Sequence, residues 1–177
     1  MPEVFVSIGS NVDRQTNVNE ALRQMEEAFG PLQVSTVYET ESVGFSGPNF
    51  YNLVAGFETD RPLDEVDRLL SQIEQRRGRR RDGAEFDDRT LDLDILLYGD
   101  TIDHQPPLDI PRSDILEYAF VLCPLAEIAG DRVHPELGRS YRDLWRSFGD
   151  RGQKLWPVAD SATRDRVTAA SGGKVSG

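Results

Sequence analysis

The stretch Arg89-Thr90-Leu91-Asp92-Leu93-Asp94-Ile95-Leu96-Leu97-Tyr98 determines both the fold and the function that we predict for this chain. Read with the two-residue period of a β-strand, it has one apolar face and one mixed face: Leu91, Leu93, Ile95 and Leu97 on the first, and Asp92, Asp94, Leu96 and Tyr98 on the second. The apolar face predicts a hydrophobic core beneath the strand. The two aspartates lie about 6 to 7 Å apart along the backbone, close enough for their side chains to converge. Because such a pair repels itself unless a cation neutralises it, and because oxygen ligands suit Mg²⁺, we predict a metal site.

Arginines precede this strand, in the run Arg76-Arg77-Gly78-Arg79-Arg80-Arg81 and again at Arg89. The guanidinium group matches the geometry of phosphate oxygens, so carboxylates for a metal beside arginines for an anion favour a metal-phosphate site. Two structural alternatives stay open. A run of charges is often only a solvated surface, and a strand can carry aspartates on its solvent face. The depletion of aspartate in strands favours the functional interpretation of Asp92 and Asp94.

The length of 177 residues predicts a single domain, which we place at residues 1–157, with a disordered tail over 158–177. A net charge of −11 and a pI of about 4.6 argue against nucleic acid or a membrane surface as the main partner, so small-molecule partners and a monomer are expected. One cysteine allows no disulfide framework. Together with the lack of a membrane-length apolar run and of a basic signal-peptide start, this predicts a cytoplasmic protein.

Hydrophobic periodicity predicts an alternation of strands and helices before the aspartate strand. The expected elements are a strand at 4–8, a helix from Asp13 or Thr16 to Gly30, strands at 32–40 and 51–59, a helix from Pro62 to Gly78, the aspartate strand, a hairpin at Gly99-Asp100 and a last helix at 141–148. This order is the βαββαβ arrangement of a ferredoxin-like α+β fold, an antiparallel sheet with both helices on one face. The C-terminal helical additions would cover part of the other face or border a cleft there.

Other common catalytic motifs are missing from the sequence. His104 and His134 lack metal-ligand spacing, so surface or capping roles are favoured over catalysis. No Gly-x-Ser-x-Gly elbow and no phosphate-binding loop of the Walker type is present. A bound nucleotide would therefore be held by arginines and magnesium.

Several segments together resemble the 6-hydroxymethyl-7,8-dihydropterin pyrophosphokinase family of folate biosynthesis. The matching segments are Ile8-Gly9-Ser10-Asn11, Phe50-Tyr51-Asn52, Gly78-Arg79, the stretch from Arg89 to Gly99, and Phe120-Val121-Leu122 before Pro124-Leu125-Ala126-Glu127-Ile128-Ala129. They occur in the family's order between about residues 4 and 148. The motif around Asp92 and Asp94 is the most specific of them.

The resemblance implies Mg²⁺-dependent transfer of the β,γ-pyrophosphoryl group of ATP to the hydroxymethyl oxygen of a reduced pterin. It implies that two Mg²⁺ ions are held by Asp92 and Asp94 and that Arg79 and Arg89 stabilise the transferring group. The residues implied for pterin binding are Thr40, Val43, Phe50, Asn52 and Phe120. The residues implied for nucleotide binding are Glu74, Arg81, Phe86, Ile95 and Arg112.

The sequence departs from the family pattern mainly on the nucleotide side. Phe86-Asp87-Asp88 stands where an aromatic residue followed by Gly-Pro is usual, and Arg112 replaces the histidine that follows the family's proline. Tyr118 stands where a basic residue is usual, and Pro107 and Asp109 replace arginine and threonine. The metal pair and the pterin side are kept, which allows a changed nucleotide preference.

Three hypotheses follow from these residues. The first is a magnesium-dependent pterin pyrophosphokinase whose charged loop at 79–88 closes on its ligands. The second is a divergent paralogue that binds a pterin-like ligand without efficient pyrophosphoryl transfer. The third is an acidic interaction module whose two aspartates only face solvent.

Overall fold

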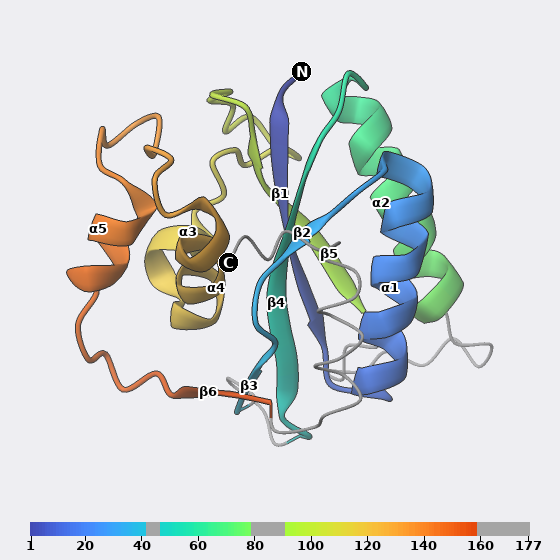
Figure 1. Cartoon of the computed structure of the whole chain (residues 1–177), viewed down its shortest axis with the longest axis horizontal. Coiled ribbons are helices and arrows are strands. Elements are labelled where there is room, and N and C mark those ends of the chain that lie inside the picture. The colour runs from blue at the N-terminus through green and yellow to red at the C-terminus, as the bar shows by residue number, and fades with distance from the viewer. Residues whose placement is uncertain (42–46, 79–90, 159–177) are drawn as a thin grey trace, which may run out of the picture.

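The computed structural model describes residues 1–41, 47–78 and 91–158, and Figure 1 shows their arrangement. Its strands are β1 (Glu3–Ser10), β2 (Gln33–Val34), β3 (Tyr38–Thr40), β4 (Phe50–Glu58), β5 (Asp92–Tyr98) and β6 (Leu155–Pro157). Its helices are α1 (Arg14–Phe29), α2 (Leu63–Gly78), α3 (Asp114–Glu117), α4 (Ala119–Ala129) and α5 (Tyr141–Arg146). None of these helices in the described part of the chain is both long enough and apolar enough to cross a membrane.

The strands form one six-stranded antiparallel sheet in the order β5-β1-β4-β3-β6, with β2 also paired to β4. Helices α1 and α2 lie on one side of the sheet, and α3, α4 and α5 lie on the other (Figure 1). The predicted α+β fold, with a ferredoxin-like βαββαβ order and C-terminal helical additions, is confirmed.

The sheet is buried on both faces because two hydrophobic clusters pack against it. Val4, Val6 and Ile8 of β1 alternate onto the face that α1 and α2 cover, and Phe5 packs on the opposite face with residues of α4 such as Leu122. Burying one such side chain contributes about 1.5–3 kcal/mol. The helices on both faces thus hold β1 and β4 in place beneath the functional site described below.

Two predicted elements differ from the structure. The expected strand at 32–40 is interrupted, because Ser35 leaves regular pairing to bond with β4: its N–H donates to the Val54 carbonyl and its Oγ accepts from the Val54 N–H, both at 2.9 Å. The expected hairpin at Gly99-Asp100 is only a turn. The described chain after it forms an isolated bridge between Asp103 and Ile110 instead of a second strand.

A β-bulge in β5 changes the predicted faces of its last residues. Phe5 pairs with Leu97 but Val6 pairs with Ile95, so Leu96 is an extra residue in β5. Leu96 and Leu97 both pack into the cluster on the α4 side, whereas Tyr98 packs with the cluster under α1 and α2. The strict alternation expected from the sequence is therefore correct from Leu91 to Leu96 and wrong for Leu97 and Tyr98.

The C-terminal part of the described chain returns to the sheet. β6 pairs with β3, and the Val158 N–H donates to the Val37 carbonyl at 2.9 Å. The Val158 side chain is buried in the core, so packing continues one residue beyond the predicted domain limit at Pro157. The remainder of the predicted tail, residues 159–177, lies outside the described residues.

Candidate active site

A cavity of about 300 Å³ lies on the face of the sheet that α3 and α4 cover. Its walls come from β1, β3, β4, β5 and the junction of α3 with α4, which are far apart in the sequence. They comprise Ser7, Ile8, Gly9, Thr40, Glu41, Phe50, Asn52, Leu53, Asp92, Asp94, Asp114, Tyr118, Phe120 and Val121. The cavity therefore brings together both proposed metal ligands and four of the five residues implied for pterin binding.

The acidic pair occupies one wall of this cavity. Asp92 pairs with Gly9 and Asp94 pairs with Ser7 on the neighbouring strand β1. These small partners leave the space above the two half-buried aspartates open. Asp114 of α3 lines the same cavity, so the pair lies among further negative charge.

Glu74 and Arg112 lie beside the acidic pair at the outer edge of the sheet. A Glu74 carboxylate oxygen accepts the Leu93 N–H at 2.8 Å. Burial raises the pKa of Glu74 to about 7; the Leu93 N–H opposes this rise, and the carboxylates of Asp92 and Asp94 add to it. Burial is therefore the main reason that Glu74 holds its proton to a higher pH than an exposed glutamate does, and the aspartates of β5 strengthen the effect.

Arg112 supplies positive charge close to Asp94. Its Nε donates to Asp114 at 2.9 Å, one Nη lies 3.9 Å from Asp94 Oδ2, and its backbone N–H donates to the Leu96 carbonyl at 3.0 Å. Arg112 is about one-third exposed, so part of its guanidinium group faces solvent. It is therefore placed to meet an anion that approaches the aspartates from the edge of the sheet.

Ile95 occupies a different position from the other candidates. Its side chain lies in the core on the α1 and α2 face, away from the cavity. The Leu93 N–H points away from β1 toward Glu74, and a strand's period of two directs the Ile95 N–H to the same outer edge. A nucleotide contact at Ile95 would therefore involve its backbone.

The opposite wall of the cavity combines a fixed side-chain amide with aromatic rings. Buried Asn52 donates from Nδ2 to Thr40 Oγ1 at 2.7 Å, which fixes the amide and leaves its Oδ1 as an acceptor. A side chain at Gly9 would place its Cβ only 3.1 Å from that oxygen, so glycine keeps this space clear. Phe50 and Phe120 add half-buried aromatic rings to the lining.

The structure adds lining residues that sequence reasoning missed. Ser7 could have been predicted as a lining residue, because it precedes Gly9 by two positions and therefore lies on the same face of the strand. Asp114 and Glu41 carried no such signal, and Tyr118 was noted only as a departure from the family pattern. The remaining predicted site residues, Val43, Arg79, Arg81, Phe86 and Arg89, lie outside the described residues.

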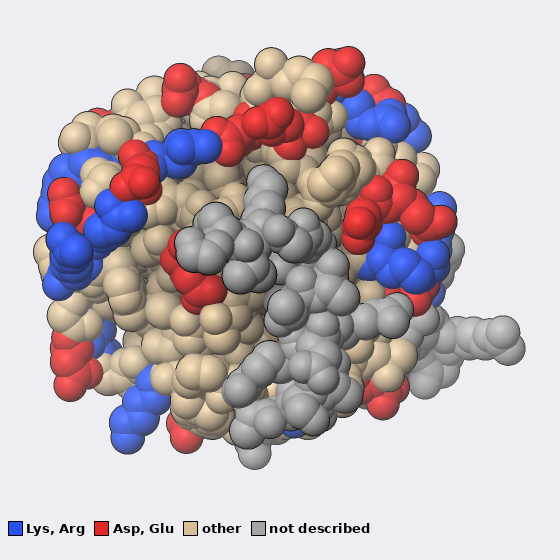
Figure 2. Space-filling view, in the orientation of Figure 1, with Lys and Arg blue, Asp and Glu red and all other residues tan. Residues whose placement is uncertain are grey.

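Basic side chains are not gathered into one basic patch on the face shown in Figure 2. On the face shown in Figure 2, basic side chains lie beside acidic ones. Across the described ranges, no group of three or more histidine, cysteine, aspartate or glutamate side chains is arranged to hold a metal ion. Any ion at Asp92 and Asp94 would therefore need further ligands from water or from a substrate.

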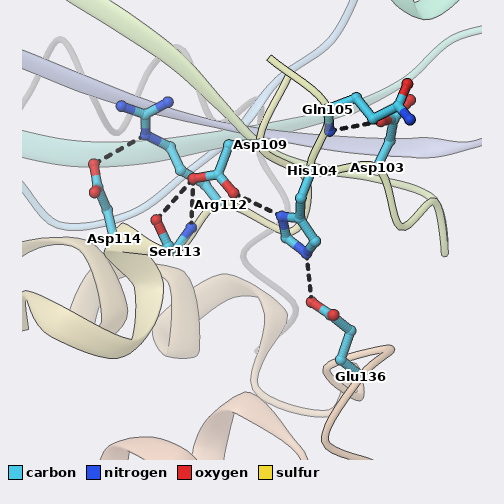
Figure 3. Close-up of polar contacts among 8 residues, drawn as sticks. All are labelled: Asp103, His104, Gln105, Asp109, Arg112, Ser113, Asp114 and Glu136. Atoms are coloured by element: carbon cyan, nitrogen blue, oxygen red, sulfur yellow. Dashed lines mark hydrogen bonds and ion pairs between the residues drawn. The ribbon is translucent and has the colours of Figure 1, made fainter. Parts of the chain in front are cut away.

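His104 forms the centre of a charged network behind Arg112, which Figure 3 shows. Its Nδ1 lies 2.7 Å from Asp109 Oδ1 and its Nε2 lies 2.8 Å from Glu136 Oε1. Asp109 also accepts hydrogen bonds from the N–H and the hydroxyl of Ser113, at the start of α3. Two ionised carboxylates both require donors, so the contacts favour the doubly protonated ring.

His134 has the predicted capping role: its Nδ1 accepts N–H groups of the following turn.

We expect the substitution His104→Gln to remove a pH-dependent part of the stability. Hydrogen bonds to Glu136 and then Asp109 raise the pKa of His104. Their contribution is therefore fully present below the ordinary histidine pKa of about 6.5 and is lost as pH rises through the folded-state value. Urea unfolding between pH 5.5 and 8.5 should show the largest difference between wild type and variant at the acidic end.

His134 provides an internal contrast in the same titration. Burial lowers its pKa, so its contribution is present at high pH and is lost as pH falls. That acid-side loss should persist in His104→Gln. Stability curves of wild type and variant that run parallel across the range would contradict the role of His104.

The fold and the cavity together define a class, a ferredoxin-like domain with a small-molecule site on the sheet face opposite its two long helices. Comparison with known proteins narrows this class. The family model for 7,8-dihydro-6-hydroxymethylpterin-pyrophosphokinase (HPPK) matches residues 5–130. The chain therefore belongs to the 7,8-dihydro-6-hydroxymethylpterin-pyrophosphokinase family, whose members are diphosphoryl-transferring enzymes of folate synthesis.

The relatives that resemble this chain include proteins of similar length and much longer proteins. The 2-amino-4-hydroxy-6-hydroxymethyldihydropteridine pyrophosphokinase of Pseudomonas aeruginosa is 38% identical over 164 residues, covering 88% of this chain and 98% of that protein. The folic acid synthesis protein fol1 of Pneumocystis carinii is 33% identical over 154 residues, covering 85% of this chain. This chain spans only 21% of the length of the fol1 protein.

A solved structure supports the fold. The wild-type HPPK-DHPS of Plasmodium falciparum, crystallised with SDX-DHP, aligns with a TM-score of 0.65 at 15% identity. The alignment covers 85% of this chain and 45% of that chain. At this level of identity the likeness shows a common architecture.

Proposed function

We propose that this chain transfers the pyrophosphoryl group of ATP to the hydroxymethyl oxygen of 6-hydroxymethyl-7,8-dihydropterin, releasing AMP. One observation carries the proposal: segments separated by up to 80 residues place six expected residues around one cavity. These residues are Thr40, Phe50, Asn52, Asp92, Asp94 and Phe120. A solvated acidic surface would not require an aromatic and amide-lined wall opposite the aspartates, so the interaction-module hypothesis has less support.

The donor set of the acidic pair fits Mg²⁺. Asp92 and Asp94 offer hard carboxylate oxygens from one strand face, and Mg²⁺ commonly takes one or two carboxylates and completes its shell with water and substrate phosphates. Once bound, Mg²⁺ would neutralise charge on the triphosphate during transfer. The two ions expected from the sequence would share these carboxylates.

The pterin would bind against the wall formed by Asn52, Thr40 and Phe120. Asn52 Oδ1 is held as an acceptor by the Thr40 contact, and it suits the N–H donors on the edge of a 2-amino-4-oxopyrimidine ring. Phe120 and Phe50 offer aromatic surfaces for stacking. This orientation would point the hydroxymethyl group toward the aspartates.

The triphosphate would approach along the outer edge of β5. There Arg112 provides a guanidinium group 3.9 Å from Asp94, in the position where the family usually has histidine. Arginine stays charged throughout the physiological pH range, so anion binding at this position would not titrate near neutral pH. We propose Glu74, Arg81, Phe86 and the backbone of Ile95 as further nucleotide contacts, and Arg79 and Arg89 as the residues that stabilise the transferring group.

The test is direct. The purified chain, incubated with ATP, 6-hydroxymethyl-7,8-dihydropterin and Mg²⁺, should form AMP and the pterin diphosphate in equal amounts. Replacement of Mg²⁺ by a chelator should stop product formation. Absence of AMP with all three components present would contradict the proposal.

A second candidate is favoured by the changes around Arg112, Asp109 and Tyr118, which depart from the family pattern. In that case the chain binds the pterin without efficient transfer. Calorimetry separates the two candidates, because the second requires normal pterin binding without binding of a non-hydrolysable ATP analogue. The monomeric state and the cytoplasmic location expected from the sequence stay predictions.

A further inference from the structure

The segment 149–158 follows the stretch that matches the family model, which ends at residue 130. It nevertheless reaches the wall of the pterin cavity. The Gln153 side chain makes two hydrogen bonds there: its Oε1 accepts the Ala119 N–H at 2.7 Å, and its Nε2 donates to the Glu117 carbonyl at 2.8 Å. One amide thus joins the end of α3 to the beginning of α4.

These two backbone groups flank Tyr118 in the chain, and Phe120 follows directly after Ala119. Ala119 is the first residue of α4, where a helix N–H has no carbonyl partner within the helix. Glu117 is the last residue of α3, and extended Tyr118 connects the two helices. The Tyr118 and Phe120 rings stack with their centroids 5.0 Å apart, so the position of the junction determines the position of both rings.

The segment is anchored on both sides of Gln153. Before it, Arg151 donates to the Leu116 carbonyl at 3.0 Å and lies over the Phe148 ring at 3.8 Å from its centroid. After it, β6 pairs with β3. Gln153 is therefore held between two fixed points, which allows its amide to act as a rigid support.

A second cavity of about 500 Å³ shows how close this support is to the site. It shares Thr40, Glu41, Tyr118 and Phe120 with the first cavity, and Gly152, Gln153 and Lys154 complete its lining. The Phe120 ring thus borders both spaces. Without a support on the side of the second cavity, the α3–α4 junction could shift into it.

We propose that Gln153 is a positioning residue for the pterin, which fixes the α3–α4 junction and thereby holds Phe120 against the ring. The inference rests on the proposed function, because it takes the reduced pterin as the ligand of the cavity. Gln153 acts through Phe120 and Tyr118 and is not itself assigned a contact with the substrate.

The test compares Gln153→Met with wild type and with Gln105→Met. Methionine keeps the length of the side chain but loses both hydrogen bonds, and Gln105 is an exposed glutamine outside both cavities. We expect Gln153→Met to raise the KM and the Kd for the pterin about tenfold, with the KM for ATP unchanged. The Ala119 amide should also exchange its hydrogen faster than in wild type. Gln105→Met should match wild type in every measurement.

The outcomes separate this inference from the proposed function. A wild-type chain that neither binds the pterin nor forms AMP would contradict the proposed function itself. An active wild type with an unchanged pterin KM in Gln153→Met would overturn the inference alone. An equal loss of kcat and of affinity for both substrates, with a lower melting temperature, would indicate a general structural role and would also overturn it.

Discussion

Asp92→Asn is expected to reduce kcat at least about a hundredfold and to shift the dependence of the rate on Mg²⁺ to higher concentrations, because one carboxylate ligand is lost while Asp94 and the substrate phosphates remain. The change keeps the shape of the side chain and removes its charge. Because Asp92 pairs with Gly9 and is half-buried, the strand should tolerate the amide without rearrangement. Steady-state rates of AMP formation across a Mg²⁺ titration measure the effect.

The matched control is Asp60→Asn. Asp60 is exposed and lies outside the cavity lining, so the same chemical change there should leave rates and the Mg²⁺ response at wild-type values. Asp94→Asn should resemble Asp92→Asn, since both carboxylates share the cavity wall. An Asp92→Asn protein with wild-type activity and an unchanged Mg²⁺ titration would exclude the acidic pair as the metal site.

Phe120→Ala should weaken pterin binding roughly 10- to 100-fold, which is the typical value of stacking an aromatic side chain on a flat heterocycle. The affinity for an ATP analogue should not change, because Phe120 lines the cavity, whereas Glu74 and Arg112, which we propose as nucleotide contacts, do not. Direct titration with the pterin in the presence of the analogue measures this difference. Phe120 is only half-buried, so the free energy of unfolding should fall less than for a core phenylalanine.

Phe120→Leu is the control for apolar volume. Leucine keeps a bulky apolar side chain against Tyr118 but offers no ring face, so its pterin affinity should be intermediate between wild type and alanine. Equal affinity in Phe120→Leu and wild type would show that shape rather than stacking holds the ligand. Equal affinity in all three proteins would exclude Phe120 from the binding site.

Local periodicity was sufficient to predict the part of the site that lies on regular strands. The spacing of Asp92 and Asp94 predicted their shared face, and the apolar run at 4–8 predicted the strand that the structure shows as β1. The family resemblance then supplied Thr40, Asn52 and Phe120, which periodicity alone would not connect. The structure brings all of them to the same cavity.

Features that depend on long-range contacts could not be predicted. The bulge at Leu96 arises from the register between β1 and β5, and nothing in the leucine run marks which residue is extra. The hydrogen bonds of Gln153 join groups 34 and 36 residues apart. An isolated glutamine belongs to no periodicity or motif from which its partners could be predicted. His104 similarly meets Glu136 only because two loops fold together.

The burial of β4 limits which substitutions can make this protein resistant to an inhibitor that imitates the pterin. Asn52 is 7% exposed and lies between Tyr51 and Leu53 in the central part of the sheet. A replacement that repels the inhibitor there would leave Thr40 without its partner and disturb the packing that holds the sheet together. Resistance should therefore arise first at exposed positions on the rim, of which Glu41 is an example, where a new side chain has little effect on folding.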